Sequence, residues 1–226
     1  MGKLVWDKVG EKYWETGVDR TVLFPMNANG AHATGVAWSG ITAINESPSG
    51  AEPTKIYADN TVYGVLMSPE EDALTIEAFT YPDEYAECIG ETSVVEGAVI
   101  KQQNHKHFGL AYRTMLGNDT EGTEHGYKIH IFWDCIAGAS EDSNSTINDS
   151  PEQKTFSWSV TALPVNAANY QPTASMVIDS TKVTKAKLDQ IEALIYGTDA
   201  DTENNVEATE SSLPTIDQLI TILKAA

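Results

Sequence analysis

Strict alternation of apolar and polar side chains in residues 155–162 restricts the fold more than any other feature of the chain. Because the side chains of a strand point alternately to its two faces, a period of two predicts a half-buried β-strand. The same alternation in residues 127–133 predicts a second strand of this kind. The apolar faces consist of Phe156, Trp158, Val160 and Ala162 in the first, and of Tyr127, Ile129, Ile131 and Trp133 in the second, with Lys128, His130 and Asp134 opposite.

Segments that favour β-structure occupy most of the chain between residues 21 and 181. Groups of turn-forming residues at 47–50, 117–119 and 149–151 separate some of them. Many short strands at such spacing are typical of a sandwich or a barrel. We therefore predict a mainly β (α+β) fold. Its weaker strands are expected at residues 21–26, 36–44, 55–67, 72–80, 94–103, 108–114 and 174–179.

The C-terminal part of the chain changes to helical periodicity. Residues 184–196 have an apolar stripe and are followed by Gly197, which is a typical helix stop. A second, shorter helix is predicted after Pro214. Residues 199–210 contain five acids and no base, which indicates a solvated linker or loop. The two stripes consist of Leu188, Ile191, Leu194 and Ile195, and of Ile216, Leu219, Ile220 and Leu223.

Two other segments are expected to reach beyond the β domain. Residues 1–19 are mixed in charge, carry three aromatic side chains and have no clear period, which favours an arm that docks on another surface. Residues 45–54 are rich in Ser, Pro and Gly and indicate a long surface loop. The predicted organisation is therefore an N-terminal arm (1–19), a β domain with a helix near 184–196 (20–197), and an acidic linker with a short helix (198–226).

The charge of the chain bears on its partners. With 33 acids and 14 bases the net charge is −19, whereas contact with phosphate needs clustered Lys and Arg. This composition argues against nucleic-acid recognition. An acidic surface would repel DNA over a Debye length of about 8 Å at physiological salt, so that DNA could slide past it. Composition alone nevertheless favours solubility as the reason for the charge.

Location and redox state follow from what the chain lacks. No run approaches the roughly 20 apolar residues of a membrane-spanning helix. Residues 1–7 also lack the apolar region of a secretory signal, so we expect a soluble protein made in a cytoplasm, with no membrane contact. Cys88 and Cys135 are then expected to be reduced and buried. A disulfide is the main alternative, because a metal site needs more ligands than this pair offers.

Three patterns that can carry chemistry have a simpler interpretation. His105 and His107 would share one face of a strand, but Lys106 between them is no ligand and no third ligand is nearby. Residues 199–210 resemble a calcium loop with Glu210 at its twelfth position, yet Asn204 stands where the loop needs Gly. Neighbouring carboxylates, at 70–72 and 83–84, are the groups that glycosidases use, but they arise by chance in so acidic a chain. We therefore predict no catalytic, cofactor-binding or metal-binding residues.

The tryptophans could line a sugar-binding groove or pack inside the protein. Trp133 and Trp158 lie on the apolar faces of predicted strands, so we expect them in the core. For Trp6, Trp14 and Trp38 we prefer packing at an interface.

Several blocks of sequence together resemble the major tail tube proteins of long-tailed (siphovirus-type) phages of Gram-positive hosts. Their order and spacing over residues 6–197 make the resemblance specific, although each block alone is weak. The blocks are WDKVGE with Tyr13 and ETGV (15–18), GVAWSGIT (35–42) with PTKIYA (53–58) and Asp59-Asn60, EAFTYPDEY (77–85) with Cys88 and Gly90, FGLAYRT (108–114) with GND (117–119) and GYKIH (126–130), TINDSPE (146–152) with FSW (156–158), and PTASMVID (172–179) with LIYG (194–197).

This resemblance implies a tail-tube-type β-sandwich or half-barrel with an outer helix, an extended N-terminal arm and a long loop. It further implies that six subunits form a ring and that rings stack into a virion tail tube. The arm and the 45–54 loop would connect rings. DNA and the tape-measure protein would pass through the lumen without specific binding, and the tube would end on terminator and distal tail proteins. Assembly would occur in the host bacterial cytoplasm, and six copies at −19 would carry −114 formal charges per ring.

Three other functions stay open at this point. A carbohydrate-binding β-sandwich of a tail tip or cell surface would show exposed tryptophans and bind glycans. A hydrolase would show a cleft with two carboxylates roughly 5–10 Å apart. The inner tube of a contractile tail would differ from the first proposal mainly in having a sheath protein around it.

Overall fold

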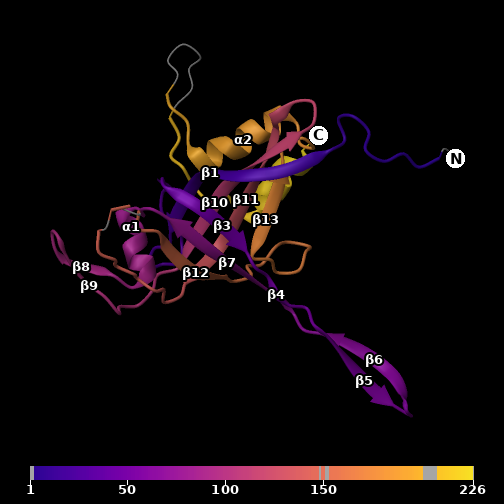
Figure 1. Ribbon diagram of the computed structural model, residues 1–226, viewed down its shortest axis with the longest axis horizontal. Helices are drawn as coiled ribbons and strands as arrows, with labels where there is room; N and C mark the ends of the chain where they lie inside the picture. The colour runs from indigo at the N-terminus through magenta and orange to yellow at the C-terminus, as the bar shows by residue number, and fades with distance from the viewer. Residues whose placement is uncertain (1–2, 148, 151–152, 201–207, 226) are drawn as a thin grey trace.

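The computed structural model describes residues 3–147, 149–150, 153–200 and 208–225. Most strands of this part belong to one nine-stranded antiparallel sheet, in the order β2-β1-β10-β11-β12-β7-β3 (Figure 1). In the same sheet β13 pairs with β11 and β4 pairs with β7, while β5–β6 and β8–β9 form separate hairpins. The fold is mainly β, as predicted.

The elements have the following bounds: β1 Tyr13–Pro25, β2 Val36–Ala37, β3 Ile41–Glu46, β4 Ser49–Gly50, β5 Pro53–Ala58, β6 Thr61–Met67, β7 Glu70–Ala78, α1 Asp83–Ala86, the 3-10 turn η1 Glu87–Ile89, β8 Thr92–Val95, β9 Ala98–Ile100, β10 Phe108–Asn118, β11 Gly122–Ala137, β12 Phe156–Ala162, β13 Ser175–Asp179, α2 Lys185–Tyr196 and α3 Ile216–Lys224.

The long strands β10 and β11 form the centre of the sheet. Residues 119–121 connect them and overlap the turn predicted at 117–119, and the Asn118 side chain organises this reversal. Its Oδ1 accepts hydrogen bonds from the backbone N–H groups of Thr120 (3.1 Å) and Glu121 (2.6 Å). An Asn side chain that binds the backbone just after it mimics a tight turn, which explains the reversal at this position.

The sheet divides along β11. Residues 128–132 pair with β13, whereas residues 135–137 pair with β12. Through β12 the sheet continues into β7 and β3, and apolar side chains of these strands share one core with those of β1 and β10. The sheet therefore curls over its own inner face, which gives a half-barrel. This inner core is formed by Leu23, Leu110, Tyr112, Leu74, Ile76, Trp158 and Val160, among others.

Helices α2 and α3 cover the other face of β1, β10, β11 and β13 (Figure 1). Ile129 and Ile131 of β11 point toward these helices, whereas Phe132 belongs to the inner core. Both faces of this part of β11 are therefore buried. The prediction that His130 lies opposite the apolar face is confirmed, but His130 is itself buried.

Both predicted helices are confirmed. In α2, Leu188, Ile191 and Ile195 are buried. In α3 a capping box closes the first turn, because the Thr215 hydroxyl accepts from the Gln218 N–H while the Gln218 side chain accepts from the Thr215 N–H. None of the helices in the described ranges is long and apolar enough to span a membrane.

Three predicted strands differ from the structure. Residues 55–67 and 94–103 form hairpins instead of single strands, with two-residue turns at Asp59–Asn60 and at Glu96–Gly97. Residues 36–44 divide into β2 and β3 at Gly40, whose φ is +84°. Asp59 and Asn60 both have positive φ, as the favoured hairpin turns require. The prediction missed these reversals because such turns interrupt a β-prone run by only two residues.

The boundaries of the two predicted extensions also change. Strand β1 begins at Tyr13 and pairs with β10, so the arm is shorter than residues 1–19. Residues 45–54, predicted to be a loop, contain the end of β3, all of β4 and the start of β5. The segment that projects from the sheet is therefore longer than the predicted loop, because it also includes the β5–β6 hairpin. Of the predicted turn at 149–151, residues 149 and 150 are described and form a bend, whereas 151 and most of the acidic 199–210 segment lie outside the described residues.

Trp38 lies in the core, so our preference for an interface role was wrong for this residue. Its side chain is buried against Tyr85 and Trp158, and Nε1–H donates to the Thr80 carbonyl at 2.8 Å. Trp38 directly follows β2, and its backbone N–H donates to the Thr21 carbonyl of β1 at 2.9 Å. Trp133 and Trp158 are buried, as predicted.

We expect Trp38→Phe to lower the free energy of unfolding by about 1–3 kcal/mol, because Phe cannot donate and leaves the Thr80 carbonyl without this partner. Urea unfolding followed by circular dichroism measures the change. Trp6→Phe, at a side chain that is 74% exposed, is the matched control and should leave the midpoint unchanged. Equal effects of the two substitutions would contradict the assignment of Trp38 to the core.

A bidentate ion pair joins β1 to β10 beside an irregularity in their register. Nε and Nη2 of Arg113 donate to the two carboxylate oxygens of Asp19 at 2.8 and 2.6 Å. The Arg113 guanidinium also lies over the ring of Tyr127, with its Cζ 4.8 Å from the ring centroid, and this contact orients it. These hydrogen bonds lower the pKa of Asp19.

A group with a lowered pKa stabilises the fold above its unfolded pKa, about 3.9 for Asp, and loses this contribution as the pH falls through its folded pKa. We therefore expect Asp19→Asn to destabilise the protein by about 1 kcal/mol at pH 7. The difference from the unchanged chain should shrink below about pH 4. Chemical denaturation of both proteins at several pH values measures this, and a difference independent of pH would contradict it.

Candidate assembly surfaces

The β5–β6 hairpin projects from the half-barrel at the end of a narrow two-stranded stalk (Figure 1). Its apolar side chains are exposed in this single chain: Ile56, Tyr57, Val62, Tyr63, Val65, Leu66 and Met67. A two-stranded hairpin is at best marginally stable by itself in water. A large apolar surface on such an element indicates a contact with another molecule.

A second hairpin, β8–β9, extends from the body in another direction (Figure 1). Four of its apolar side chains are exposed: Val94, Val95, Val99 and Ile100. It is shorter than β5–β6, and two residues separate its start from the end of η1. The chain thus carries two different apolar projections, which can form contacts between unlike surfaces of neighbouring copies.

The N-terminal segment is the third extension. Leu4, Trp6 and Val9 are strongly exposed, so the described part of this segment leaves them uncovered. Only its end is held, where Asp119 Oδ1 accepts from the Gly10 N–H at 2.9 Å. Docking of this segment on another surface stays a prediction. Trp14, already in β1, packs so closely over Gly117 that a Cβ there would lie 2.4 Å from its Nε1.

The sheet has open edges. Within the described residues, the outer sides of β2, β3 and β13 pair with no further strand. Unpaired N–H and C=O groups at such edges are templates for pairing with another chain. The chain therefore offers unpaired strand edges that could extend the sheet into another copy.

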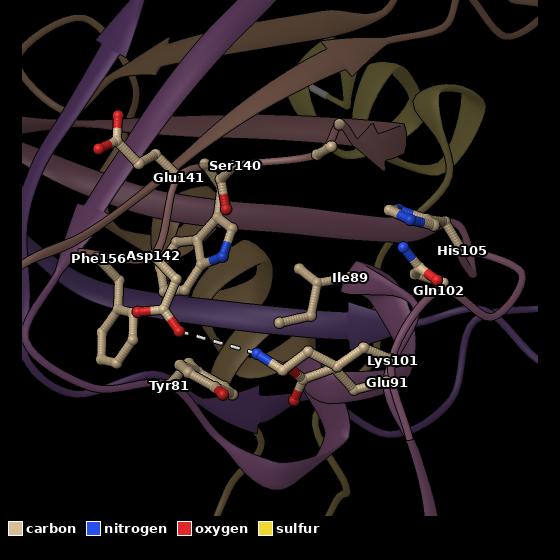
Figure 2. A pocket seen from close by; sticks show the side chains of 13 residues that line it. Tyr81, Ile89, Glu91, Lys101, Gln102, His105, Ser140, Glu141, Asp142 and Phe156 are labelled. Atoms are coloured by element: carbon tan, nitrogen blue, oxygen red, sulfur yellow. Dashed lines mark ion pairs between the residues drawn. The ribbon is translucent and has the colours of Figure 1, made fainter. Parts of the chain in front are cut away.

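A small cavity lies between the β8–β9 hairpin and the loop after β11 (Figure 2). Its volume is about 230 Å³. Tyr81, Phe156 and Trp158 form its aromatic side, while Glu91, Lys101 and Asp142 supply charges. Typical ligand pockets are about 300–1,000 Å³, so this one is small for a ligand.

The charged side chains that line the cavity form ion pairs with one another. Lys101 Nζ lies 3.0 Å from Oε1 of Glu91 and 3.8 Å from Oδ2 of Asp142. A dashed line in Figure 2 marks the ion pair between Lys101 and Asp142. The hydrogen bond to Glu91 raises the pKa of Lys101, and burial with the nearby Glu91 carboxylate raises the pKa of Tyr81. Both groups are thus kept protonated, so neither serves as a base at neutral pH. The arrangement fits a structural ion pair better than a reactive site.

The two histidines of the H-x-H pattern have separate partners. His105 Nδ1 contacts the Ala137 carbonyl at 2.7 Å, and His107 Nδ1 contacts Asp134 Oδ1 at 2.6 Å. No group of three or more potential metal ligands occurs among the described residues. The calcium-like pattern falls largely on residues 201–207, outside them; Glu210, its last position, accepts from the Thr34 hydroxyl at 3.0 Å.

The two groups of neighbouring carboxylates lie in different places. Asp83 and Glu84 are in the first turn of α1. Glu70, Glu71 and Asp72 line a groove together with Ser175, whose hydroxyl donates to Asp72 at 2.9 Å. Glycosidic general-acid catalysis needs a carboxyl group with a raised pKa. Among the described residues, the carboxyl groups with a displaced pKa all have a lowered one, because Lys, Arg, His or hydroxyl partners stabilise the ionised form. These groups are Glu15, Asp19, Glu46, Asp142 and Asp179.

Cys88 and Cys135 are buried and unpaired, as predicted. Burial raises the pKa of Cys88 to about 12, and also raises that of Cys135. Both thiols therefore stay protonated at neutral pH, and a thiol is a poor nucleophile in that form.

Comparison with known proteins adds no family: no family model and no curated protein sequence matches the chain. The exposed hairpins are the surfaces that sequence reasoning missed. The signal that could have found them is Asp59–Asn60, a turn-forming pair inside a β-prone run.

Proposed function

We propose that the chain is the structural subunit of a phage tail tube, in which six copies form a ring and rings stack around a lumen for DNA. The observation that carries the proposal is the β5–β6 hairpin, which extends from a mainly β half-barrel with its apolar side chains uncovered. A hairpin of this composition needs a covering surface. In a homopolymer, another copy of the chain supplies that surface.

The sheet edges support a ring. Edge pairing of β3, β13 or β2 with a neighbour joins unlike surfaces, and such contacts close into a ring when the rotation between copies allows it. Closure removes the edges that would otherwise recruit further chains. The hairpins and the N-terminal segment are then available for contacts between rings.

The net charge supports passage of DNA rather than its binding. Six copies carry −114 formal charges, and acidic walls repel the phosphate backbone. The partners in this proposal are further copies of the chain, a tape-measure protein in the lumen, and terminator and distal tail proteins at the ends of the tube. The protein would act in the virion during genome ejection, without enzymatic activity.

Negative-stain electron microscopy of the concentrated protein tests this function. We expect rings with six-fold symmetry or tubes of stacked rings, with a lumen wide enough for duplex DNA. A protein that stays monomeric at high concentration, measured by light scattering, would contradict the proposal.

A carbohydrate-binding module is the second candidate, because the aromatic cavity of Figure 2 resembles a small sugar site. Its volume and its internally paired charges weaken this interpretation. A glycan array separates the two functions. Saturable glycan binding by a monomer favours the second, and tubes with no glycan binding favour the first.

A further inference from the structure

A polar cluster lies where the projecting arm leaves the sheet. Glu46, the last residue of β3, directly precedes the stalk, and its carboxylate meets side chains from the centre of the sheet. His130 Nδ1 lies 2.8 Å from Glu46 Oε1, and the Tyr112 hydroxyl donates to the same oxygen. On the other side of the ring, His130 Nε2 lies 3.1 Å from Thr114 Oγ1 and 3.6 Å from Glu15 Oε1.

The positions of the hydrogens follow from counting donors. The Thr114 hydroxyl has one hydrogen, which it donates to Glu15 Oε1 at 2.5 Å, so toward His130 its oxygen can only accept. An ionised Glu46 likewise only accepts. Both ring nitrogens of His130 therefore face acceptors. A neutral imidazole has one N–H and would leave one of these contacts without a hydrogen, whereas the imidazolium has two.

Both carboxylates are ionised at neutral pH. The hydrogen bond from His130 is the main cause of the lowered pKa of Glu46, and Tyr112 adds to it. For Glu15 burial opposes ionisation, but hydrogen bonds from Lys128 and Thr114 outweigh it and the pKa is lowered. The charged groups around His130 are thus Glu46 from β3, Glu15 from β1 and Lys128 from its own strand.

Packing holds the ring of His130 in place. Its side chain is only 11% exposed, and Tyr112 stacks on it with ring centroids 4.6 Å apart and planes 8° apart. The ring therefore cannot turn toward solvent without breaking this stack.

We propose that His130 is a doubly protonated imidazolium that clasps Glu46 and Glu15, and so positions the root of the β4–β5–β6 arm on the sheet. The clasp links three strands that are far apart in sequence, and the arm begins one residue after it. This inference concerns a single copy of the chain and does not rest on the proposed tail function. Loss of either proton removes one of the two contacts and frees the root of the arm.

Nitrogen NMR of the ¹⁵N-histidine-labelled, monomeric protein tests the protonation state. The His130 signals are assigned as those missing from His130→Gln. At pH 7 we expect both ring nitrogens at the chemical shift of protonated imidazolium nitrogens. One protonated and one unprotonated nitrogen at this pH would overturn the proposal, and the measurement needs no variant other than the one used for assignment.

Hydrogen exchange tests the positioning of the arm. The Ser47 N–H donates to the Ala73 carbonyl at 2.7 Å, so its protection reports on the root of the arm. When the pH of the same sample is raised until its nitrogen spectrum shows only one protonated nitrogen on His130, we expect the protection factor of Ser47, corrected for intrinsic exchange, to fall about tenfold. A protection factor that stays constant through this step would overturn the positioning role.

Variants separate the clasp from general stability. His130→Gln should reduce Ser47 protection about tenfold, because Gln is uncharged and cannot serve both carboxylates. His125→Gln is the matched control, since His125 also contacts a carboxylate, Glu121 at 2.6 Å, but lies at the far end of β11. It should leave Ser47 protection unchanged. Equal protection in the two variants would contradict the clasp, whether or not the chain forms tubes.

Discussion

Replacing Tyr63 and Leu66 by aspartate is expected to abolish ring stacking while leaving the subunit folded. Both side chains lie on β6 and are more than 60% exposed in the single chain, so the charges cost little there. In a tube the same surface would be covered. Burial of an unpaired carboxylate costs several kcal/mol, and each ring would bury twelve of them if all six copies carried both changes.

Electron microscopy and analytical ultracentrifugation measure this effect, with circular dichroism as the test of folding. We expect tubes from the unchanged chain and only single subunits or isolated rings from the variant. The matched control is Ser143→Asp with Ser145→Asp, which adds the same charge at exposed positions in the loop after β11. Tubes from the Tyr63→Asp/Leu66→Asp variant would show that the hairpin lies outside the contacts between rings.

The largest loss of stability is expected for Trp158→Ala, about 3–5 kcal/mol in the free energy of unfolding. Trp158 is 2% exposed and forms the centre of an aromatic cluster. Its ring centroid lies within 6 Å of four others, those of Trp38, Tyr81, Tyr85 and Phe156. The side chain also lines the cavity, together with Tyr81 and Phe156 of the same cluster, so alanine would extend the cavity toward the core.

Thermal and urea unfolding measure this loss, and the midpoint should fall on the order of 10 °C for a chain of this length. Tyr170→Ala, at an exposed side chain, is the control and should change stability by less than about 0.5 kcal/mol. A loss below about 1 kcal/mol for Trp158→Ala would mean that the core repacks around the missing ring.

Much of the sheet could be predicted because alternation is a local property. The residues of β12 that alternate in sequence are those that alternate between core and surface, and the same holds for α2 and α3 with a helical period. The exposure of the two hairpins on the surface of the single chain could not be predicted in the same way, although the Asp59–Asn60 turn of one of them is visible in the sequence. Their strands are apolar on exposed surfaces, and a single chain offers no partner that would explain this composition.

The burial of Trp38 shows a second limit. Its neighbours in sequence indicate a short strand, but its environment comes from Tyr85 and Trp158, which are 47 and 120 positions away. No local period contains this information. The acidic segment 199–210 was identified by composition alone, and only its flanks lie among the described residues.

The amino-acid sequence by itself determined the β class, the two C-terminal helices, the buried thiols and the strong negative charge, because each depends on composition or on a period within one segment. Only the tertiary structure decided how the sheet divides at β11, which hairpins project, and how His130 is held. Those features depend on pairing and side-chain contacts across long separations in sequence, such as Glu15, Glu46 and His130, where the energy of a contact is set by what folding brings beside it.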